Sequence, residues 1–191
     1  MKNKILQNVK ELQNALTVAG LNYEICWIYK EKESRERFVD TLNAYPLFFQ
    51  TSLHAHFVAM IIALYRLFET RKDTVNIPQL IKLFKKEGTF PRMEFQRLES
   101  EIEQIKPLWI KVSILRNKLF GHRSNALDNE DIWKEASVTP NEFKKLIEDS
   151  KRILNEMTSI WNRSSHAFNL SATEDTMDLL EDLKSHNEER L

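Results

Sequence analysis

Apolar residues recur every three or four positions along most of the chain, which is the spacing of a helix that buries one face. This pattern predicts a long helix over residues 2–30, a shorter helical piece near 35–44 and a third helix over about 47–71. The third stripe is wide enough for a helix in the middle of a bundle and consists of Phe49, Leu53, Phe57, Met60, Ile61, Leu64 and Phe68. A core helix is expected here, because the uncharged run 51–65 is shorter than the roughly 20 apolar residues that cross a bilayer.

Capping residues mark the next helices. Asn76 as an N-cap, Pro78 in the first turn and Gly88 as a stop predict a helix of about three turns. A further helical pattern starts near Pro91 and continues to Phe120, and Pro107 is expected to kink or restart it.

The C-terminal part of the chain contains one more long helix and a charged tail. After a loop and a brief helix, the segment 139–142 reads Thr-Pro-Asn-Glu, a capping box that predicts a helix over 140–162. A linker follows, and the tail carries an apolar stripe of Met177, Leu180 and Leu183 that predicts a turn or two of amphipathic helix. We therefore divide the chain into a helical domain, 1–165, and an acidic linker and tail helix, 166–191.

Composition supports an all-α fold. Only three glycines and five prolines occur among 191 residues, so long stretches contain nothing that breaks a helix. The single cysteine, Cys26, excludes an internal disulfide and a cysteine-based zinc cage, which fits a reducing, cytoplasmic environment. We expect no secretory segment at the charged N-terminus, no membrane partner and no cofactor.

The net charge of zero conceals two regions of opposite sign. The tail 174–191 has seven acidic and two basic residues, a net charge of −5, so the rest of the chain carries +5. Such a tail is expected either to cover a basic cleft or another helix, as a regulatory or partner-assembling segment, or to be a disordered solubilising extension. The segment 104–127 contains no acid and five cations, namely Lys106, Lys111, Arg116, Lys118 and Arg123.

The end of this basic segment, "LRNKLFGHR", contains the most suggestive group of polar residues. Helical spacing places Arg116 on the flank of an apolar stripe of Leu108, Val112, Leu115 and Leu119, where a permanent charge must be paired, extended to solvent or pointed into a cleft. Gly121 can end the helix and let His122 turn back toward Arg116 and Asn117. The alternative is ordinary capping, because Arg, Lys, Gly and His are common at helix C-termini.

The stretch "RNKLFGH" resembles the R-x(4–6)-H signature of HEPN domains, in which a polar residue, often Asn, follows the arginine. Residues 56–84 are similar to the central helix and the following short helix of the abortive-infection, AbiU2-like branch, and the resemblance extends over roughly residues 5–163. It implies a HEPN-like helical bundle and a metal-independent ribonuclease that works as a homodimer. It also implies a toxin or anti-phage effector, with a possible antitoxin or regulatory protein as partner.

The chemistry implied by the resemblance needs no metal. His122 would exchange protons with the ribose 2′-hydroxyl and the leaving 5′-oxygen, and Arg116 would stabilise the charge on the phosphorane. Asn117 would orient the histidine or the phosphate by hydrogen bonding. The substrate is then RNA, since DNA lacks the internal nucleophile. Lys111, Lys118 and Arg123 would hold the flanking RNA backbone.

Other polar residues have weaker patterns. Glu69 pairs with Arg66 one helical turn away or, by the resemblance, supports Arg116. His54 and His56 are two apart on a helix and so face different directions, which argues against a shared metal. The four tryptophans lie on separate segments and are expected to be core residues.

Both the function and the assembly of the chain have alternative interpretations. The alternatives to a ribonuclease are a catalytically inactive HEPN-like binding or scaffold module and a plain helical interaction protein whose motif residues cap a helix. Ile110 and Ile114 form a second apolar side on the motif helix, which predicts either a two-fold homodimer contact near the motif or packing under the 123–139 loop of the same chain.

Overall fold

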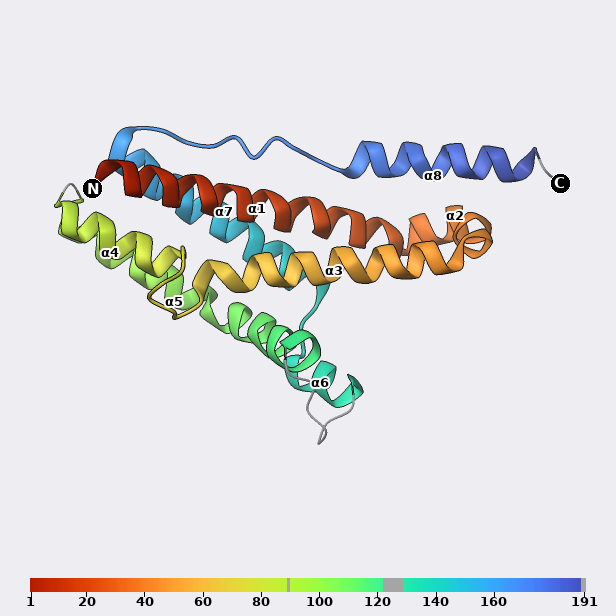
Figure 1. Ribbon diagram of the computed structural model, residues 1–191, viewed down its shortest axis with the longest axis horizontal. Coiled ribbons are helices and arrows are strands. Elements are labelled where there is room, and N and C mark those ends of the chain that lie inside the picture. Colours follow the sequence, from red (N-terminus) through yellow and green to blue (C-terminus); the bar gives the residue numbers. More distant parts are fainter. Residues whose placement is uncertain (89, 122–128, 190–191) are drawn as a thin grey trace.

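The computed structural model describes residues 1–88, 90–121 and 129–189, and all regular secondary structure within these ranges is helical. The elements are α1 (Lys2–Lys30), α2 (Lys32–Ala44), α3 (Pro46–Phe68), α4 (Ile77–Glu87), α5 (Arg92–Leu115), a π-helical segment η1 (Arg116–Gly121), α6 (Asn129–Ala136), α7 (Pro140–Asn162) and α8 (Thr173–Glu188). In Figure 1, α1, α3 and α7 form the long middle of the bundle, with α8 on one side and α4, α5 and α6 on the other. The prediction of an all-α fold is confirmed.

The expected caps form where the sequence placed them. The side chain of Asn76 accepts a hydrogen bond from the backbone N–H of Gln79 at 2.9 Å, and Gly88 adopts the left-handed conformation, with φ of 78°, that ends α4. Thr139 and Glu142 form the reciprocal hydrogen bonds of a capping box at the start of α7. Local sequence thus determines these boundaries.

Of the two effects expected of Pro107, a kink or a restart, the restart does not occur. The proline lies inside α5, which is assigned without a break over its 24 residues. A proline removes one backbone donor, whereas the core residues on either side of it, Ile105 and Val112, are both buried. Packing therefore keeps α5 in one piece and carries it to the motif.

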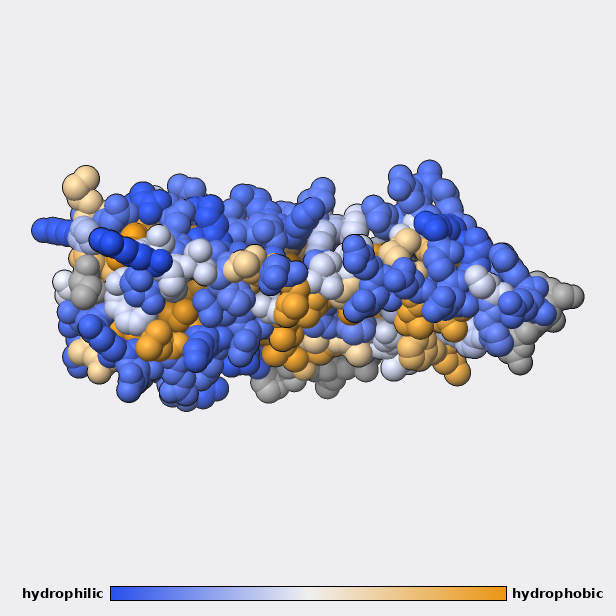
Figure 2. All heavy atoms as spheres, turned by 90° about the horizontal axis from the view of Figure 1, so that it is seen from above, coloured by the Kyte–Doolittle hydropathy of each residue, from blue (hydrophilic) through white to orange (hydrophobic). Residues whose placement is uncertain are grey.

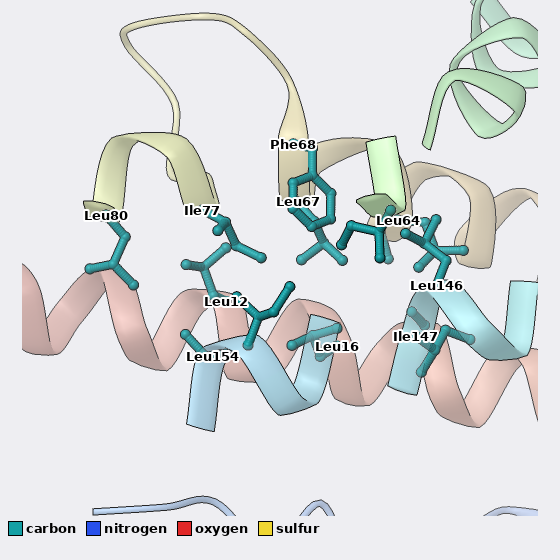
Figure 3. Close-up of a cluster of buried hydrophobic side chains, with 14 of the residues drawn as sticks. Leu12, Leu16, Leu64, Leu67, Phe68, Ile77, Leu80, Leu146, Ile147 and Leu154 are labelled. Carbon is teal, nitrogen blue, oxygen red and sulfur yellow. The ribbon is translucent and has the colours of Figure 1, made fainter. Parts of the chain in front are cut away.

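The main core lies where α1, α3, α4 and α7 meet. Figure 3 shows side chains from all four helices pointing toward one another: Leu12, Leu16, Leu64, Leu67, Phe68, Ile77, Leu80, Leu146, Ile147 and Leu154. Each of them is buried. Of the apolar stripe expected on α3, Met60, Ile61, Leu64 and Phe68 enter this core.

Among the described residues, α3 is the one helix long and apolar enough to cross a membrane, a test that core helices of soluble proteins also pass. It packs against α1 along most of its length and also against α5 and α7. Met60, Ile61 and Leu64 enter the main core. These contacts are those of a central bundle helix, as the sequence pattern predicted.

The acidic tail forms a full helix that packs on its own chain. Leu180, only 1% exposed, joins a second apolar cluster with Ile28, Tyr29, Phe38 and Phe49, so α8 lies against α1 and α2. Glu24 accepts hydrogen bonds from the backbone of Ala172 and the hydroxyl of Ser171 at the start of α8. The outward face of this part of the molecule is mainly hydrophilic (Figure 2). Of the expected alternatives, the tail covers other helices, on the side of the bundle away from α5 (Figure 1).

Candidate functional site

The motif lies on η1, which continues α5 with wider π-helical winding from Arg116 to Gly121. π-Helical segments occur frequently at functional sites, because they change the direction of side chains within a helix. The apolar stripe faces inward as expected: Val112 and Leu115 are buried, and Leu119 packs against the main core. His122 and Arg123 lie outside the described residues, so the expected approach of His122 to Arg116 stays a prediction.

An aromatic ring and a neutral amide hold the guanidinium of Arg116. Its carbon lies 4.7 Å from the centroid of the Tyr65 ring, and Nη1 donates to the side-chain oxygen of Asn117 at 2.9 Å. Asn117 in turn donates to the hydroxyl of Ser113 at 3.3 Å. Within the ranges that the structure describes, no carboxylate pairs with Arg116. The arrangement therefore leaves its positive charge available to an anion.

Trp109 fixes the platform beneath Arg116. Its indole N–H donates to the backbone carbonyl of Tyr65 at 3.0 Å, and the two rings stack with centroids 5.9 Å apart. A rigid ring under a planar guanidinium restricts the orientations that it can adopt. Tyr65 and Trp109 thus support the guanidinium of Arg116 from below, and Asn117 holds it from the side.

The two described lysines of the expected RNA-binding set are both paired with acids. Lys111 lies 2.7 Å from a carboxylate oxygen of Glu142 and donates to the carbonyl of Ser137 at 2.6 Å. Lys118 lies 2.5 Å from a carboxylate oxygen of Glu135 on α6. The segment 104–127 is free of acids in sequence, yet α6 and α7 bring carboxylates to it in space. These lysines thus fasten α5 and η1 to neighbouring helices.

The Lys111 contact has a measurable consequence for stability. The pKa of Glu142 is lowered, first by the hydrogen bond from Lys111 and then by the backbone N–H of Thr139. A carboxyl whose folded pKa is depressed stabilises the fold above its ordinary value of 4.5, and this contribution is lost as the pH falls through the folded pKa.

We expect Glu142→Gln to lower the free energy of unfolding at pH 7 by about 1 kcal/mol or less, because it keeps the capping geometry and loses the charge. The difference from the parent should disappear in acid, below the ordinary carboxyl pKa. Urea unfolding at a series of pH values measures this. Glu148→Gln, an exposed position on the same helix, is the control and should show a smaller pH-dependent difference.

Glu69 is buried at the end of α3, 7% exposed and one turn beyond Tyr65. It forms no ion pair with Arg66 or with Arg116 within the described part of the chain. Its charge instead contributes to raising the pKa of Arg71, after the stronger hydrogen bond and charge of Asp73. The expected support of Arg116 by Glu69 therefore stays a prediction.

The histidines of α3 and the single cysteine lie in different surroundings. His54 contacts the edge of Phe120, while His56 bonds to the side-chain oxygen of Asn22 at 2.7 Å, so the two imidazoles face different neighbours as expected. Burial lowers the pKa of His56 and raises that of the Cys26 thiol to about 12, which makes the latter a poor nucleophile. Among the described residues, no group of His, Cys, Asp and Glu is arranged to hold a metal ion.

One cavity beside the motif was not foreseen. It has a volume of about 460 Å³ and lies between α1, α3, α6 and the start of α7. Trp27 and Trp133 line it, whereas Trp109 and Trp161 pack against the main core. The expectation that all four tryptophans are core residues is therefore wrong for these two. No sequence signal links Trp27 with Trp133, because they line one cavity only after α1, α3 and α6 have been arranged by the fold.

Comparison with known proteins adds one finding. The sequence model of the HEPN_AbiU2 family, described as AbiU2, matches residues 2–181 and so extends from α1 into α8. No curated protein and no solved structure matches the chain. The match covers nearly the whole sequence, including the Arg116 segment on η1. The chain therefore belongs to the AbiU2 family, an abortive-infection branch of the HEPN domains.

Proposed function

We propose that the protein is a metal-independent endoribonuclease, acting in the cytoplasm as a toxin or anti-phage effector. The observation that supports this best is the state of Arg116, a cation held on the Tyr65 ring with no carboxylate partner within the described residues. A guanidinium fixed in this way is prepared to receive a phosphate, and its orientation does not have to be acquired when substrate binds.

In the proposed reaction, the ribose 2′-oxygen attacks the neighbouring phosphorus while the bond from phosphorus to the 5′-oxygen breaks. The proton of the attacking 2′-hydroxyl passes to a neutral His122 imidazole, and the leaving 5′-oxygen receives a proton from a His122 imidazolium. Arg116 stabilises the phosphorane oxygens, and Asn117 holds the guanidinium through its side-chain oxygen. The products are a 2′,3′-cyclic phosphate and a 5′-hydroxyl.

The direct test uses purified protein, total RNA and EDTA. We expect cleavage that persists in the chelator and leaves 2′,3′-cyclic phosphate ends, because the hydrogen bonds and positive charge of Arg116 would stabilise the phosphorane without a metal ion. End-group analysis of the fragments measures this. Protein that leaves every RNA class intact, alone and together with the products of neighbouring genes, would contradict the proposal.

We further propose a homodimer with its two-fold axis near the motif. Ile110 is 46% exposed on α5, and helical spacing places it on the same side as the exposed Asn117. Ile114, by contrast, packs partly against the main core. A two-fold contact through Ile110 would bury an apolar residue and bring two copies of the motif to one groove, so that a base, an acid and charge stabilisation come from two chains.

Mixing subunits tests the shared site. Arg116→Ala and His122→Ala homodimers should each be inactive, and we expect partial activity when the two are mixed and allowed to exchange, because one composite site then regains both groups. Cleavage rates of the mixture against each parent measure this. A monomeric mass at micromolar concentration, or a mixture as inactive as its parents, would remove the dimer from the proposal.

A binding or scaffold function is the second candidate, and one observation favours it. Lys111 and Lys118, which were expected to hold the RNA backbone, are both neutralised by acids. An inactive HEPN-like module would use its helices to hold a partner protein, such as an antitoxin or regulatory protein, and would need neither lysine free. Protein that neither binds nor cuts RNA, but is captured by the product of a neighbouring gene, would favour this function.

A further inference from the structure

We propose that the cavity between α1, α3, α6 and α7 binds one unpaired base of the RNA that the motif cleaves. The inference rests on the proposed ribonuclease function and names how that site holds its substrate. The volume of about 460 Å³ falls within the roughly 300–1,000 Å³ of small-molecule sites, and most of the lining is apolar.

Aromatic rings from separate helices line the cavity. Tyr23 and Trp27 on α1 lie nearly parallel, with an interplanar angle of 7° and centroids 6.4 Å apart. Trp133 comes from α6, and its ring centroid lies 5.5 Å from that of Phe57 on α3. Flat aromatic surfaces are how proteins hold unpaired bases, because every base has a π-face to stack on them.

Polar groups of this cavity are unused within the part of the chain that the structure describes. Trp109 and Trp161 both donate their indole N–H groups, to Tyr65 and Glu87, whereas Trp27 and Trp133 have no hydrogen-bond acceptor there. The exposed side chains of Gln50, His54 and Lys30 also have no hydrogen bond or ion pair among these residues. An aromatic cavity with unused donors and one ammonium group matches a base attached to a phosphate better than an apolar peptide side chain.

The cavity and the motif share a wall. Phe120 lies on η1, four residues after Arg116. Its ring centroid is 6.0 Å from that of His54 and 6.1 Å from that of Phe57, and both of these residues line the cavity. Tyr65, whose ring lies beneath Arg116, follows Phe57 by eight residues on α3. This spacing corresponds to a rise of about 12 Å along the helix axis. A short stretch of single-stranded RNA can therefore have a phosphate at Arg116 and a nearby base in the cavity.

An abasic scan tests the inference without requiring cleavage. A short RNA with 2′-O-methyl groups throughout cannot be cut, and variants of it each lack the base at one position. We expect one abasic position to weaken binding to the wild-type protein about tenfold, in line with the loss of one stacked base. Trp133→Ala should bind the intact and the abasic oligonucleotide equally, since the stacking surface is gone. Phe48 is an exposed aromatic residue on α3 outside the cavity, so Phe48→Ala is the matched control and should keep the tenfold difference.

Lys30→Gln provides a second variant, because its exposed side chain is not needed for folding. It should weaken binding of every oligonucleotide while preserving the abasic difference.

Equal binding of all abasic variants, or an abasic difference that persists in Trp133→Ala, would overturn the base site even in an enzyme that cleaves RNA. Tighter binding of a free mononucleotide than of the intact oligonucleotide would also overturn it. The expected coupling in a protein that never cuts RNA would support the base site and count against the nuclease.

Discussion

Arg116→Ala is expected to lower the rate of RNA cleavage by about 10²–10³-fold or more, the usual effect of removing one group that stabilises a charged transition state. The structure gives the reason, since the guanidinium is oriented by the Tyr65 ring and by Asn117 and has no competing carboxylate among the described residues. Single-turnover cleavage of a defined RNA in EDTA measures the effect. Thermal unfolding of the variant should be close to that of the parent, because Arg116 is only half buried.

Two further substitutions make this result specific. Arg116→Lys keeps the charge but loses the planar, two-pronged donor, so we expect an intermediate rate. Arg71→Ala removes another arginine near the same end of α3, one already paired with Asp73 at 2.6 Å, and should leave the rate unchanged. A rate in Arg116→Ala within a few-fold of the parent would show that Arg116 is a capping residue.

Leu180→Asp is expected to detach α8 and to destabilise the protein by about 3 kcal/mol or more, because it places a charge in a closed apolar cluster. Leu180 is 1% exposed against Ile28 and Phe38, and α8 is tethered by a linker, 163–172, that has no regular structure. Limited proteolysis of this linker and the melting temperature measure the effect.

Leu179→Asp is the matched control, since the neighbouring side chain is 45% exposed and the same charge can remain in water. It should melt like the parent and resist protease equally. If Leu180→Asp and Leu179→Asp have the same melting temperature and the same rate of proteolysis, the contact between α8 and the second cluster contributes little to the stability of the fold. Because α8 lies away from α5 (Figure 1), neither variant should change the metal-free cleavage rate directly.

The basic segment shows the limit of reading charge along the chain. Residues 104–127 contain five cations and no acid, and Lys111 and Lys118 among them were expected to hold the RNA backbone. Folding brings Glu135 and Glu142 to Lys118 and Lys111, and leaves Arg116 without such a partner among the described residues. A one-dimensional charge count cannot separate these three cations, because ion pairing depends on which helices are neighbours.

Sequence by itself determined the helices, since caps and apolar periodicity act within a few residues. Asn76, Gly88 and the Thr139–Glu142 box set the ends of α4 and the start of α7, and the motif was placed at the end of its helix. Only the tertiary structure decided that α5 passes through Pro107, that the acidic tail packs as α8, and that Trp27 and Trp133 line one cavity beside η1. Each of these depends on contacts between residues far apart in the chain, which local spacing does not encode.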